Sequence, residues 1–493
     1  MSRRVRPLVA AGLCAALAAC AVGPNYRRPA APPSAVFKEA QGWVPAAPAS
    51  IVPAHWWSIY HDPVLSRLER QVEVSNQTLR AAVAAYYAAR AAAGVTRGTL
   101  FPSIGLGASR TRSGGGAATQ FPFGGARTAN QAGASVSWDL DLWGKLRREL
   151  QSANAQAQAS AADVAAARLS AQATLAEDYF QLRAAEQQLR LLKLAVHDDQ
   201  VSLRIAQNRV AAGVTTLADV YSARTTLEST QSQEETAQLN RANLEHALAV
   251  LIGEAPSQLT LARGRLAASV PVVPAGVPSR VLLRRPDVAA AERAMASANA
   301  GIGVAEAGWF PSVTLSGSYD FDSASLSNLI RASNAVWSFG PSLAENLFNG
   351  GATLAQTREA RASYDEAVAN YRQTVLNAFQ QVENDLATLH FLQNEHAQER
   401  QAVEDAGRAE TLTLNQYKAG VADYATLLSA QTARLTAEIT LVNLQSQRLV
   451  ASVDLIDAVG GGWNSAALRT RNDGIRETLG STVAGPPRTA APH

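Results

Sequence analysis

The chain carries the same succession of sequence features twice. Residues 208–214 (NRVAAGV) match residues 415–421 (NQYKAGV) at an offset of 207, and residues 100–104 (LFPSI) match residues 309–313 (WFPSV) at an offset of 209. A repeat of this length is longer than a solenoid unit and indicates duplication of a whole structural module. Each half of the chain is therefore expected to fold to the same plan.

Very long helices are the dominant predicted element of each half. Leucine or valine recurs every seven residues over residues 175–210, and an aliphatic residue recurs in the same way over residues 428–456. Uncapped patterns of this length are typical of coiled coils. We expect helices over residues 144–210 and 353–417, each about 100 Å long at ~1.5 Å per residue.

Shorter helices are expected on either side of each long one. In the first half they cover residues 64–96 and 216–252, and together they nearly match the long helix in length. Stacked end to end, they are expected to lie antiparallel beside it. Gly213 and Gly420 make the turns after the long helices, because glycine accepts a positive φ at a helix end.

Alternating apolar and polar residues predict two strands in each half. Ile104, Leu106 and Ala108 alternate with serine and glycine, and residues 313–321 alternate in the same way. Period two with one apolar face indicates a strand, and a length near ten residues suits a tilted membrane strand. Four strands cannot close a membrane barrel, because open edges leave backbone groups unpaired in lipid. Either the sheet is soluble or several chains pool their strands.

The N-terminus predicts export from the cell interior. Arg3, Arg4 and Arg6 precede an apolar run that is too short to span a bilayer, which is typical of a secretory signal peptide. The run ends in residues 17–20 (LAAC), which resemble a bacterial lipobox. We expect cleavage before Cys20, with diacylglycerol and a fatty acyl group on Cys20 and no other cofactor. The alternative is an ordinary signal peptide in which Cys20 has no role.

Loss of the signal peptide changes the charge argument. The net charge of +3 comes from the three leading arginines, so the mature chain has 41 basic and 41 acidic side chains. The pI near 8.9 therefore gives no support for a nucleic-acid partner. Cys14 leaves with the signal peptide, so no disulfide or cysteine metal site is expected within one mature chain.

Short motifs follow one another along both halves, mostly where predicted elements meet. In chain order they are AVGPNYRRP (21–29), Trp56-Trp57 with Asp62-Pro63, Asn76 with Leu79, Trp143-Gly144-Lys145, Arg285-Pro286-Asp287 with Ala291-Glu292, and Phe310-Pro311-Ser312.

Together these motifs resemble the outer-membrane factor family, the TolC- and OprM-like channels, in the lipoprotein branch called NodT-type. The resemblance covers Cys20 to about Trp463. It implies an α+β membrane protein that forms a homotrimer in the outer membrane. Each chain would give four strands to one twelve-stranded β-barrel and two antiparallel coiled-coil hairpins to a long periplasmic α-barrel. The implied function is the exit duct of a tripartite efflux pump, and the implied partners are a periplasmic adaptor and an inner-membrane transporter of the RND type.

The resemblance also places a gate at the tips of the helical hairpins, around Gly213 and Gly420. Asp219 and Tyr417 fall on positions that link neighbouring hairpins in the closed state of the family, and a tyrosine hydroxyl can donate to a carboxylate. The alternative is a solvated helix surface at both positions.

The constriction departs from the family pattern. Many members carry an aspartate nine residues past the second tip glycine, where this chain has Ser429, and the apolar constriction position is Ala425. Asp423 is then a candidate for a substitute ring of three carboxylates, and Tyr424 is a candidate for narrowing the aperture.

Enzymatic chemistry is not expected. His390 and His396 are six residues apart, which differs from the i, i+4 spacing of two ligands on one helix face. Residues 301–303 (GIG) fall inside a predicted helix without a phosphate-loop context, and no Ser-His-Asp or Cys-His arrangement is discernible. The main alternative to the duct is a lipid-tethered periplasmic coiled-coil structural protein, and an envelope hydrolase is a second. The sequence does not select the exported substrate.

The expected organisation follows from these elements. The boundaries are 1–19 signal peptide, 20–61 lipidated extended segment, 62–255 first repeat (helix, β-hairpin 101–140, helical hairpin 144–252), 256–286 linker, 287–462 second repeat (helix, β-hairpin 311–345, helical hairpin 353–459), and 463–493 disordered tail.

Overall fold

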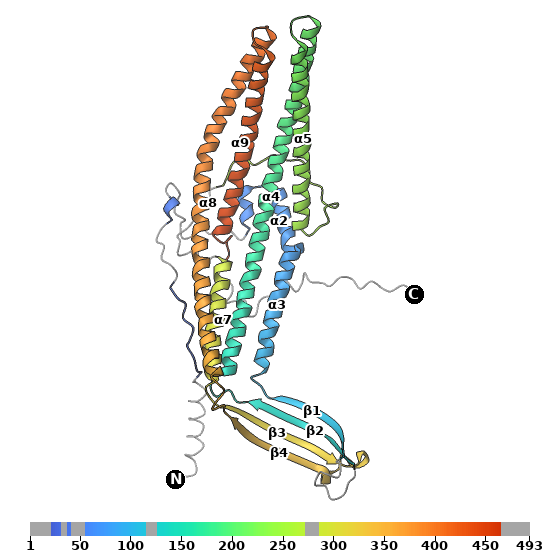
Figure 1. The fold of residues 1–493 in the computed structure, drawn as a ribbon, viewed down its shortest axis with the longest axis vertical. Helices are drawn as coiled ribbons and strands as arrows, with labels where there is room; N and C mark the ends of the chain where they lie inside the picture. Colours follow the sequence, from blue (N-terminus) through green and yellow to red (C-terminus); the bar gives the residue numbers. More distant parts are fainter. Residues whose placement is uncertain (1–20, 31–36, 41–54, 115–125, 272–284, 465–493) are drawn as a thin grey trace, which may run out of the picture. The chain divides into compact units, whose positions relative to one another are not determined.

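The computed structural model describes residues 21–30, 37–40, 55–114, 126–271 and 285–464, which are mostly helical with one four-stranded sheet (Figure 1). The predicted signal peptide, Cys20, the glycine-rich loop of the first β-hairpin and the tail after residue 464 lie outside the described residues. Two compact units divide the chain. Unit 1 contains Met1–Ala30, Ala85–Ser160 and Ala290–Arg372, and unit 2 contains Ala31–Ala84, Ala161–Ala289 and Gln373–His493.

The helices of the two halves match in length. The two longest, α4 and α8, have 67 residues each, and the helices that follow them, α5 and α9, have 35 each. Among the described residues, no helix combines the length and apolarity that a membrane span requires. The helices are α2 (Pro63–Ser75), α3 (Gln77–Gly98), α4 (Lys145–Ala211), α5 (Leu217–Leu251), α7 (Pro286–Ala307), α8 (Ala352–Lys418) and α9 (Tyr424–Ala458), with short 3-10 turns that include η2 (Trp56–Tyr60).

The helix predicted over residues 64–96 is in fact two helices, because Asn76 interrupts it. Asn76 has an extended backbone, and its Oδ1 accepts a hydrogen bond from the backbone N–H of Leu79 at 2.8 Å. This bond caps the start of α3. The prediction of one continuous helix was therefore wrong at this residue.

The same asparagine joins two helices end to end. Its Nδ2 donates to the carbonyl of Leu251 at 2.8 Å, at the end of α5. In the second half Arg285 makes the equivalent joint, since its Nη1 donates to the carbonyl of Ala458 at 2.8 Å, at the end of α9. Leu251 and Ala458 are 207 residues apart, so different side chains close the same joint in each repeat.

Helix α2 runs antiparallel to α4 within unit 2. At its start, Asp62 caps the helix and accepts a hydrogen bond from the hydroxyl of Tyr179 at 2.6 Å. Near its end, Glu73 accepts one from Gln172 at 3.3 Å. Later residues of α2 thus contact earlier residues of α4, as the predicted end-to-end stacking of the shorter helices requires.

The core of unit 2 forms where η2 meets the long helices. Trp56 and Trp57 are buried, and the ring of Tyr60 lies 4.9 Å from that of Phe180 on α4. The hydroxyls of Tyr60 and Ser452 on α9 are 2.7 Å apart. The double-tryptophan motif therefore fills the space between elements of both repeats.

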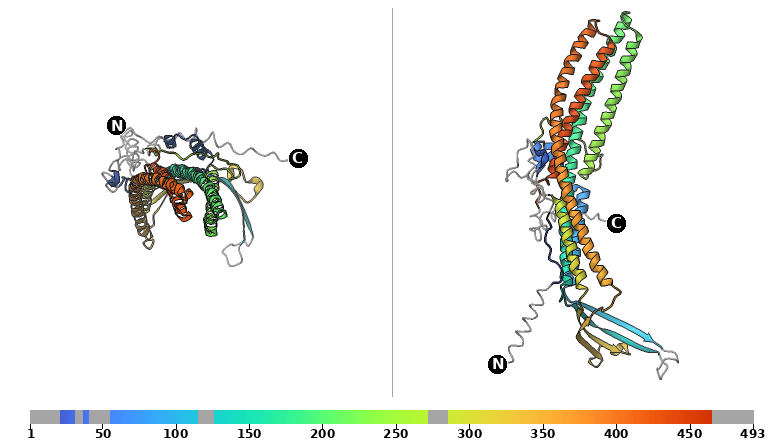
Figure 2. Two further views of the ribbon diagram at one scale, coloured as in Figure 1. Left: turned by 90° about the horizontal axis from the view of Figure 1, so that it is seen from above. Right: turned by 60° about the vertical axis from the view of Figure 1, so that its left-hand side comes forward.

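The four strands form one antiparallel sheet in the order β1-β2-β3-β4 (Figures 1 and 2). This confirms the prediction of two strands in each half. Within the described residues, β1 and β4 each pair on one side only, so both outer edges keep unpaired backbone groups. The strands are β1 (Ser103–Ser113), β2 (Arg127–Asp139), β3 (Ser312–Ser323) and β4 (Ala335–Ala344).

The register gives the sheet one apolar and one polar face. Residues directly opposite each other share a face, and one row joins Leu106, Ala134, Tyr319 and Trp337. Leu106 and Trp337 are 87% and 72% exposed, so this face is uncovered. The neighbouring row, on the polar face, joins Gly107, Gly133, Asp320 and Val336.

A buried ion-pair network ties the segment after α5 to the helices of unit 2. Glu186 accepts hydrogen bonds from Arg183 at 2.7 Å and from Arg241 at 3.1 Å, and its side chain has no exposed surface. It also accepts from the backbone N–H of Gly264 at 2.8 Å. Arg241 in turn donates to the carbonyl of Leu261 at 2.9 Å. These bonds fix residues 261–264 against α4 and α5.

Replacement of Glu186 is expected to destabilise the protein strongly. Glu186→Ala leaves Arg183 buried without its carboxylate, which costs about 3 kcal/mol of unfolding free energy. Thermal and guanidinium unfolding of the purified protein measure this change. Arg408→Ala is the matched control, because Arg408 pairs with Asp405 on an exposed surface, and a change within about 0.5 kcal/mol is expected there. Equal losses of unfolding free energy in the two variants would contradict a stabilising role for this network.

Candidate functional site

Both hairpin tips turn at glycines in the left-handed conformation. The φ angles of Gly213 and Gly420 are +69° and +78°. After Gly213, the N–H of Val214 donates to the carbonyl of Arg209 at 2.9 Å. After Gly420, the N–H of Val421 donates to the carbonyl of Gln416, also at 2.9 Å. The glycines thus close the last turns of α4 and α8 in the same way.

A small apolar cluster joins the two hairpins close to their tips, within unit 2. Tyr417 and Tyr424 are 1% and 2% exposed, and their ring centroids are 6.1 Å apart. Ala206 from α4 and Val220 from α5 belong to the same cluster. Tyr424 therefore lies between the hairpins of this chain, and its role in narrowing an aperture stays a prediction.

Arg209 reinforces this contact and was not anticipated from the sequence. Its Nη1 donates to the carbonyl of Tyr417 at 3.0 Å, and its guanidinium carbon lies 4.7 Å from the centroid of the Tyr417 ring. A cation over an aromatic face is attracted by the ring electrons. The position equivalent to Arg209 in the second repeat is Gln416, so the repeat pattern gave no indication of this role.

Asp219 and Tyr417 do not bond to each other within this chain. The carboxylate of Asp219 accepts a hydrogen bond from the hydroxyl of Thr215. The hydroxyl of Tyr417 is buried and has no hydrogen-bond partner among the described residues. Burial raises the pKa of Tyr417, and the nearby Arg209 partly offsets this rise. The latch between Asp219 and Tyr417 stays a prediction about neighbouring hairpins.

Asp423 caps α9 and remains exposed. Its Oδ1 accepts hydrogen bonds from the backbone N–H of Thr426 at 2.8 Å and from the hydroxyl of Thr426 at 2.5 Å. These bonds lower the pKa of Asp423, so its charge is kept at neutral pH. Ala425 and Ser429, the two constriction positions, are also exposed.

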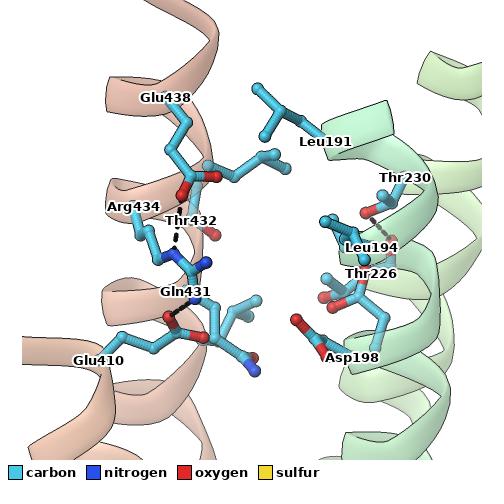
Figure 3. Close-up of a pocket in the computed structure, with 14 residues that line it drawn as sticks. Leu191, Leu194, Asp198, Thr226, Thr230, Glu410, Gln431, Thr432, Arg434 and Glu438 are labelled. Atoms are coloured by element: carbon cyan, nitrogen blue, oxygen red, sulfur yellow. Dashed lines mark hydrogen bonds and ion pairs between the residues drawn. The ribbon is translucent and has the colours of Figure 1, made fainter. Parts of the chain in front are cut away.

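A cavity of about 60 Å³ lies between the two hairpins, below the tip cluster (Figure 3). On the α9 side, Arg434 is held by Glu410 at 2.6 Å and by Glu438 at 3.0 Å. On the α4 side, Asp198 lines the cavity, and burial followed by the charge of Glu410 raises its pKa. Leucine side chains from both hairpins line the same cavity, so apolar as well as polar groups meet across the gap.

Acidic side chains gather around Arg285 in unit 2. Burial raises the pKa of Glu177 to about 8, and Asp454, with which it shares a hydrogen bond, adds to the rise. Burial also raises the pKa of Asp385 to about 7, against the opposing charge of Arg285. Burial likewise raises the pKa of Asp457, again against the charge of Arg285. The cluster therefore retains protons near neutral pH, which lowers the repulsion between α4, α8 and α9.

The N-terminal segment is fixed to both repeats within unit 1. Arg148 on α4 donates to the carbonyls of Val22 at 3.0 Å and Gly23 at 2.9 Å. Tyr26 donates to Glu292 on α7 at 2.5 Å. The motifs around residues 21–29 and 291–292 are thus two halves of one contact.

The described residues contain no group of three or more His, Cys, Asp or Glu side chains suited to hold a metal ion. Gly301 and Gly303 lie within α7, and Gly303 packs against Arg148 and the segment at Val22.

Comparison with known proteins agrees with this architecture. The family model described as outer membrane efflux protein matches residues 68–254 and 277–461. The cation efflux system protein CusC of Escherichia coli is 30% identical over 458 residues, which cover 91% of this chain and 97% of CusC. The outer membrane protein OprJ of Pseudomonas aeruginosa is 30% identical over 462 residues, covering 91% of this chain and 94% of OprJ. The solved outer-membrane channel OprN matches with a TM-score of 0.84 at 30% identity, covering 90% of this chain and all of that one (100%).

The long hairpins and the four-stranded sheet are those of an outer-membrane efflux channel, a non-enzymatic transport component. The chain belongs to the outer membrane efflux protein family, and its place is the outer membrane. This confirms the resemblance inferred from the motifs and the function that it implied.

The acidic cluster predicts a loss of stability as the pH rises. The pKa of Glu177 is raised in the folded protein, so the folded state holds a proton that the unfolded state releases above its usual pKa near 4.3. The loss of unfolding free energy that Glu177 causes is therefore absent below about pH 4. It grows as the pH rises toward the folded pKa of about 8. Glu177→Gln should raise the melting temperature by a few degrees at pH 8 and change it little at pH 4.

The control for this experiment is Glu395→Gln, which alters an exposed carboxylate on α8. It should leave the difference between pH 4 and pH 8 as in the unsubstituted protein. A Glu177→Gln protein with an unchanged pH dependence would contradict the assignment.

Proposed function

We propose that three copies of this chain form one exit duct, in which β1–β4 of each copy build a twelve-stranded barrel and the helical hairpins build a periplasmic tunnel. The observation that carries this proposal is the sheet itself. Within the described residues it has an exposed apolar face, which is unfavourable in water, and two unpaired edges, which are not tolerated in lipid.

Barrel closure satisfies both features at once. An unpaired backbone group in lipid costs several kcal/mol, and the two edges expose β1, with 11 residues, and β4, with 10. Pairing β4 of one copy with β1 of the next removes every edge after three copies if the ring closes at twelve strands. Pooling also turns all the apolar faces outward, toward lipid.

The polar face would then line a hydrated lumen. Its rows consist largely of small serine, glycine and threonine side chains, as in the pairing of Ser135 with Ser318 and of Ser318 with Ser338. Asp139, Asp320 and Asp322 lie on the same face, so the lumen carries negative charge. A wide polar interior suits a duct that passes chemically different cargoes.

The lipid on Cys20 is proposed to enter the membrane beside the strands. The N–H of Val22 donates to the carbonyl of Trp143 at 2.9 Å, at the junction between β2 and α4. Cys20 is two residues away, so an acyl group there would lie at the periplasmic end of the sheet. The lipid would assist anchoring, while the strands would span the membrane.

The hairpin tips are proposed to form the gate, and a periplasmic adaptor and an inner-membrane transporter, most simply of the RND type, are the proposed partners. Opening would separate the hairpins, which Arg209, Tyr417 and Tyr424 hold together. In the trimer, Asp219 and Tyr417 of neighbouring hairpins are proposed to link directly. The cargo is proposed to be chosen by the adaptor and the transporter.

The lipid-tethered structural protein is the competing proposal, and the sheet opposes it. A coiled-coil rod in the periplasm would expose the apolar sheet face to water, because Leu106 and Trp337 are largely exposed on that face.

Assembly and pore formation test the proposal together. The full-length lipidated protein in mild detergent is expected to have the mass of three copies and to conduct ions in planar bilayers. Gly133→Val is the informative variant, because a side chain there would meet the backbone of Asp320 at 2.6 Å and disrupt the β2–β3 pairing. It should lose conductance. A stable monomer without pores in the unsubstituted protein would refute the duct.

The substitute acidic ring is tested separately at Asp423. If three copies of Asp423 surround the opening, both Asp423→Ala and Asp423→Ser should reduce the preference of the reconstituted channel for cations. Serine still caps a helix, so only the alanine variant should also weaken the start of α9. Conductance and reversal potentials in a salt gradient measure the first effect, and hydrogen exchange over residues 424–428 measures the second. Unchanged cation preference in both variants would exclude the ring.

A further inference from the structure

Charged residues of the four strands are separated by face. The carboxylates of Asp139, Asp320 and Asp322 lie on the polar face, whereas Arg110 and Arg112 of β1 lie on the apolar face, in line with Ile104 and Leu106. Arg127, at the start of β2, is opposite Ser113 and lies on the polar face. The apolar face therefore has positive charge at one end of β1 and no carboxylate in its described strand residues.

The two arginines lie just beyond the last apolar row. That row joins Ala108, Ala132, Phe321 and Ala335. The next row on the same face joins Arg110, Asn130 and Ser323, and Asn130 donates to the carbonyl of Ser323 at 2.9 Å. The face thus changes from apolar to polar at one level across three strands.

The boundary between the apolar and polar rows lies at a height along β1 that matches the membrane surface remote from the helices. Residues 104 and 112 are eight residues apart, which spans about 27 Å along a strand and about 20 Å across the membrane at a tilt near 40°. The apolar band of an outer-membrane barrel is about 25 Å tall. Strand β1 starts after α3, so its Arg112 end is the one remote from the helices.

Both guanidinium groups are available for a ligand. Arg110 and Arg112 are exposed, and neither has a hydrogen-bond or ion-pair partner in the described part of the chain. Residues two apart on a strand have their Cα atoms ~6.6 Å apart on the same face. Guanidinium groups bind phosphate oxygens through paired hydrogen bonds, and their alkyl stems can lie along the apolar surface below.

We propose that Arg110 and Arg112 bind the phosphate groups of a phosphorylated glycolipid in the outer leaflet of the outer membrane. This inference rests on the proposed function, because it needs the apolar face of the sheet to contact lipid. Charge complementarity selects the ligand: two cations on the lipid-facing side, at headgroup level and without a partner among the described residues, meet an anionic headgroup. In a trimer the six guanidinium groups would form three such sites around the barrel.

Lipid binding by the full-length protein tests the proposal. Diphosphoryl lipid A is added to the lipidated protein in mild detergent, and native mass spectrometry counts the bound molecules over a concentration series. The unsubstituted protein should bind it, and the Arg110→Ser/Arg112→Ser protein should bind it at least about tenfold more weakly. Arg127→Ser, the control on the opposite face, should bind as the unsubstituted protein does. Arg110→Lys/Arg112→Lys should retain part of the binding, because it keeps the charge.

The chemistry of the probe separates the outcomes. Lipid A without its phosphates should bind weakly to every variant, and equal binding of phosphorylated and phosphate-free forms would overturn the proposal. Equal binding of phosphatidylglycerol would replace it with general attraction to anionic lipid. Conductance of each variant in planar bilayers distinguishes failure of the proposed function from failure of this inference alone. If the unsubstituted protein forms no pore, the proposed function fails; if pores persist and lipid A binding is unchanged in Arg110→Ser/Arg112→Ser, only this inference fails.

Discussion

Unpaired backbone at the two edges of an apolar-faced sheet is the constraint on which the architecture depends. A soluble protein would cover the face on which Leu106 and Trp337 are exposed, and a membrane protein must pair the edges of β1 and β4. Within the described residues, a single chain neither covers this face nor pairs these edges. Assembly is therefore part of the proposed fold, and the same register that turns apolar residues outward places the strand carboxylates on the opposite, inner face.

The duplicated helices of unit 2 meet end to end at polar joints as well as in a buried core. Each 67-residue helix is accompanied by two shorter ones, and a single polar side chain closes the junction between them. Asn76 reaches the end of α5, and Arg285 reaches the end of α9. Free carbonyls at helix ends need partners, so these residues satisfy a backbone requirement. Burial of Glu177 and its acidic neighbours beside Arg285 makes this region dependent on protonation.

The gate region combines a buried aromatic contact with a small cavity between the hairpins. Tyr417 and Tyr424 are buried together, and Arg209 covers one of them. Below them the two hairpins face each other across a small cavity, where Arg434 is already held by its own hairpin. Separation of the hairpins would therefore break apolar contacts both in the tip cluster and in a second cluster farther from the tips. The tip residues named by the resemblance lie in this region: Tyr424 is internal, and Asp423 caps a helix while it remains exposed.

The sequence by itself determined the repeat, the long helices and the four strands, because heptad spacing, period-two alternation and turn glycines are local patterns. The family came from the resemblance of its short motifs. It also located the joint motifs without explaining them. Only the tertiary structure decided what those motifs bind, since Asn76 with Leu251, Tyr26 with Glu292 and Trp56 with the long helices are contacts between distant segments. The break at Asn76 escaped prediction because one side chain that caps a helix leaves the periodic pattern almost unchanged. Arg209 escaped it because its partner, Tyr417, lies 208 residues away.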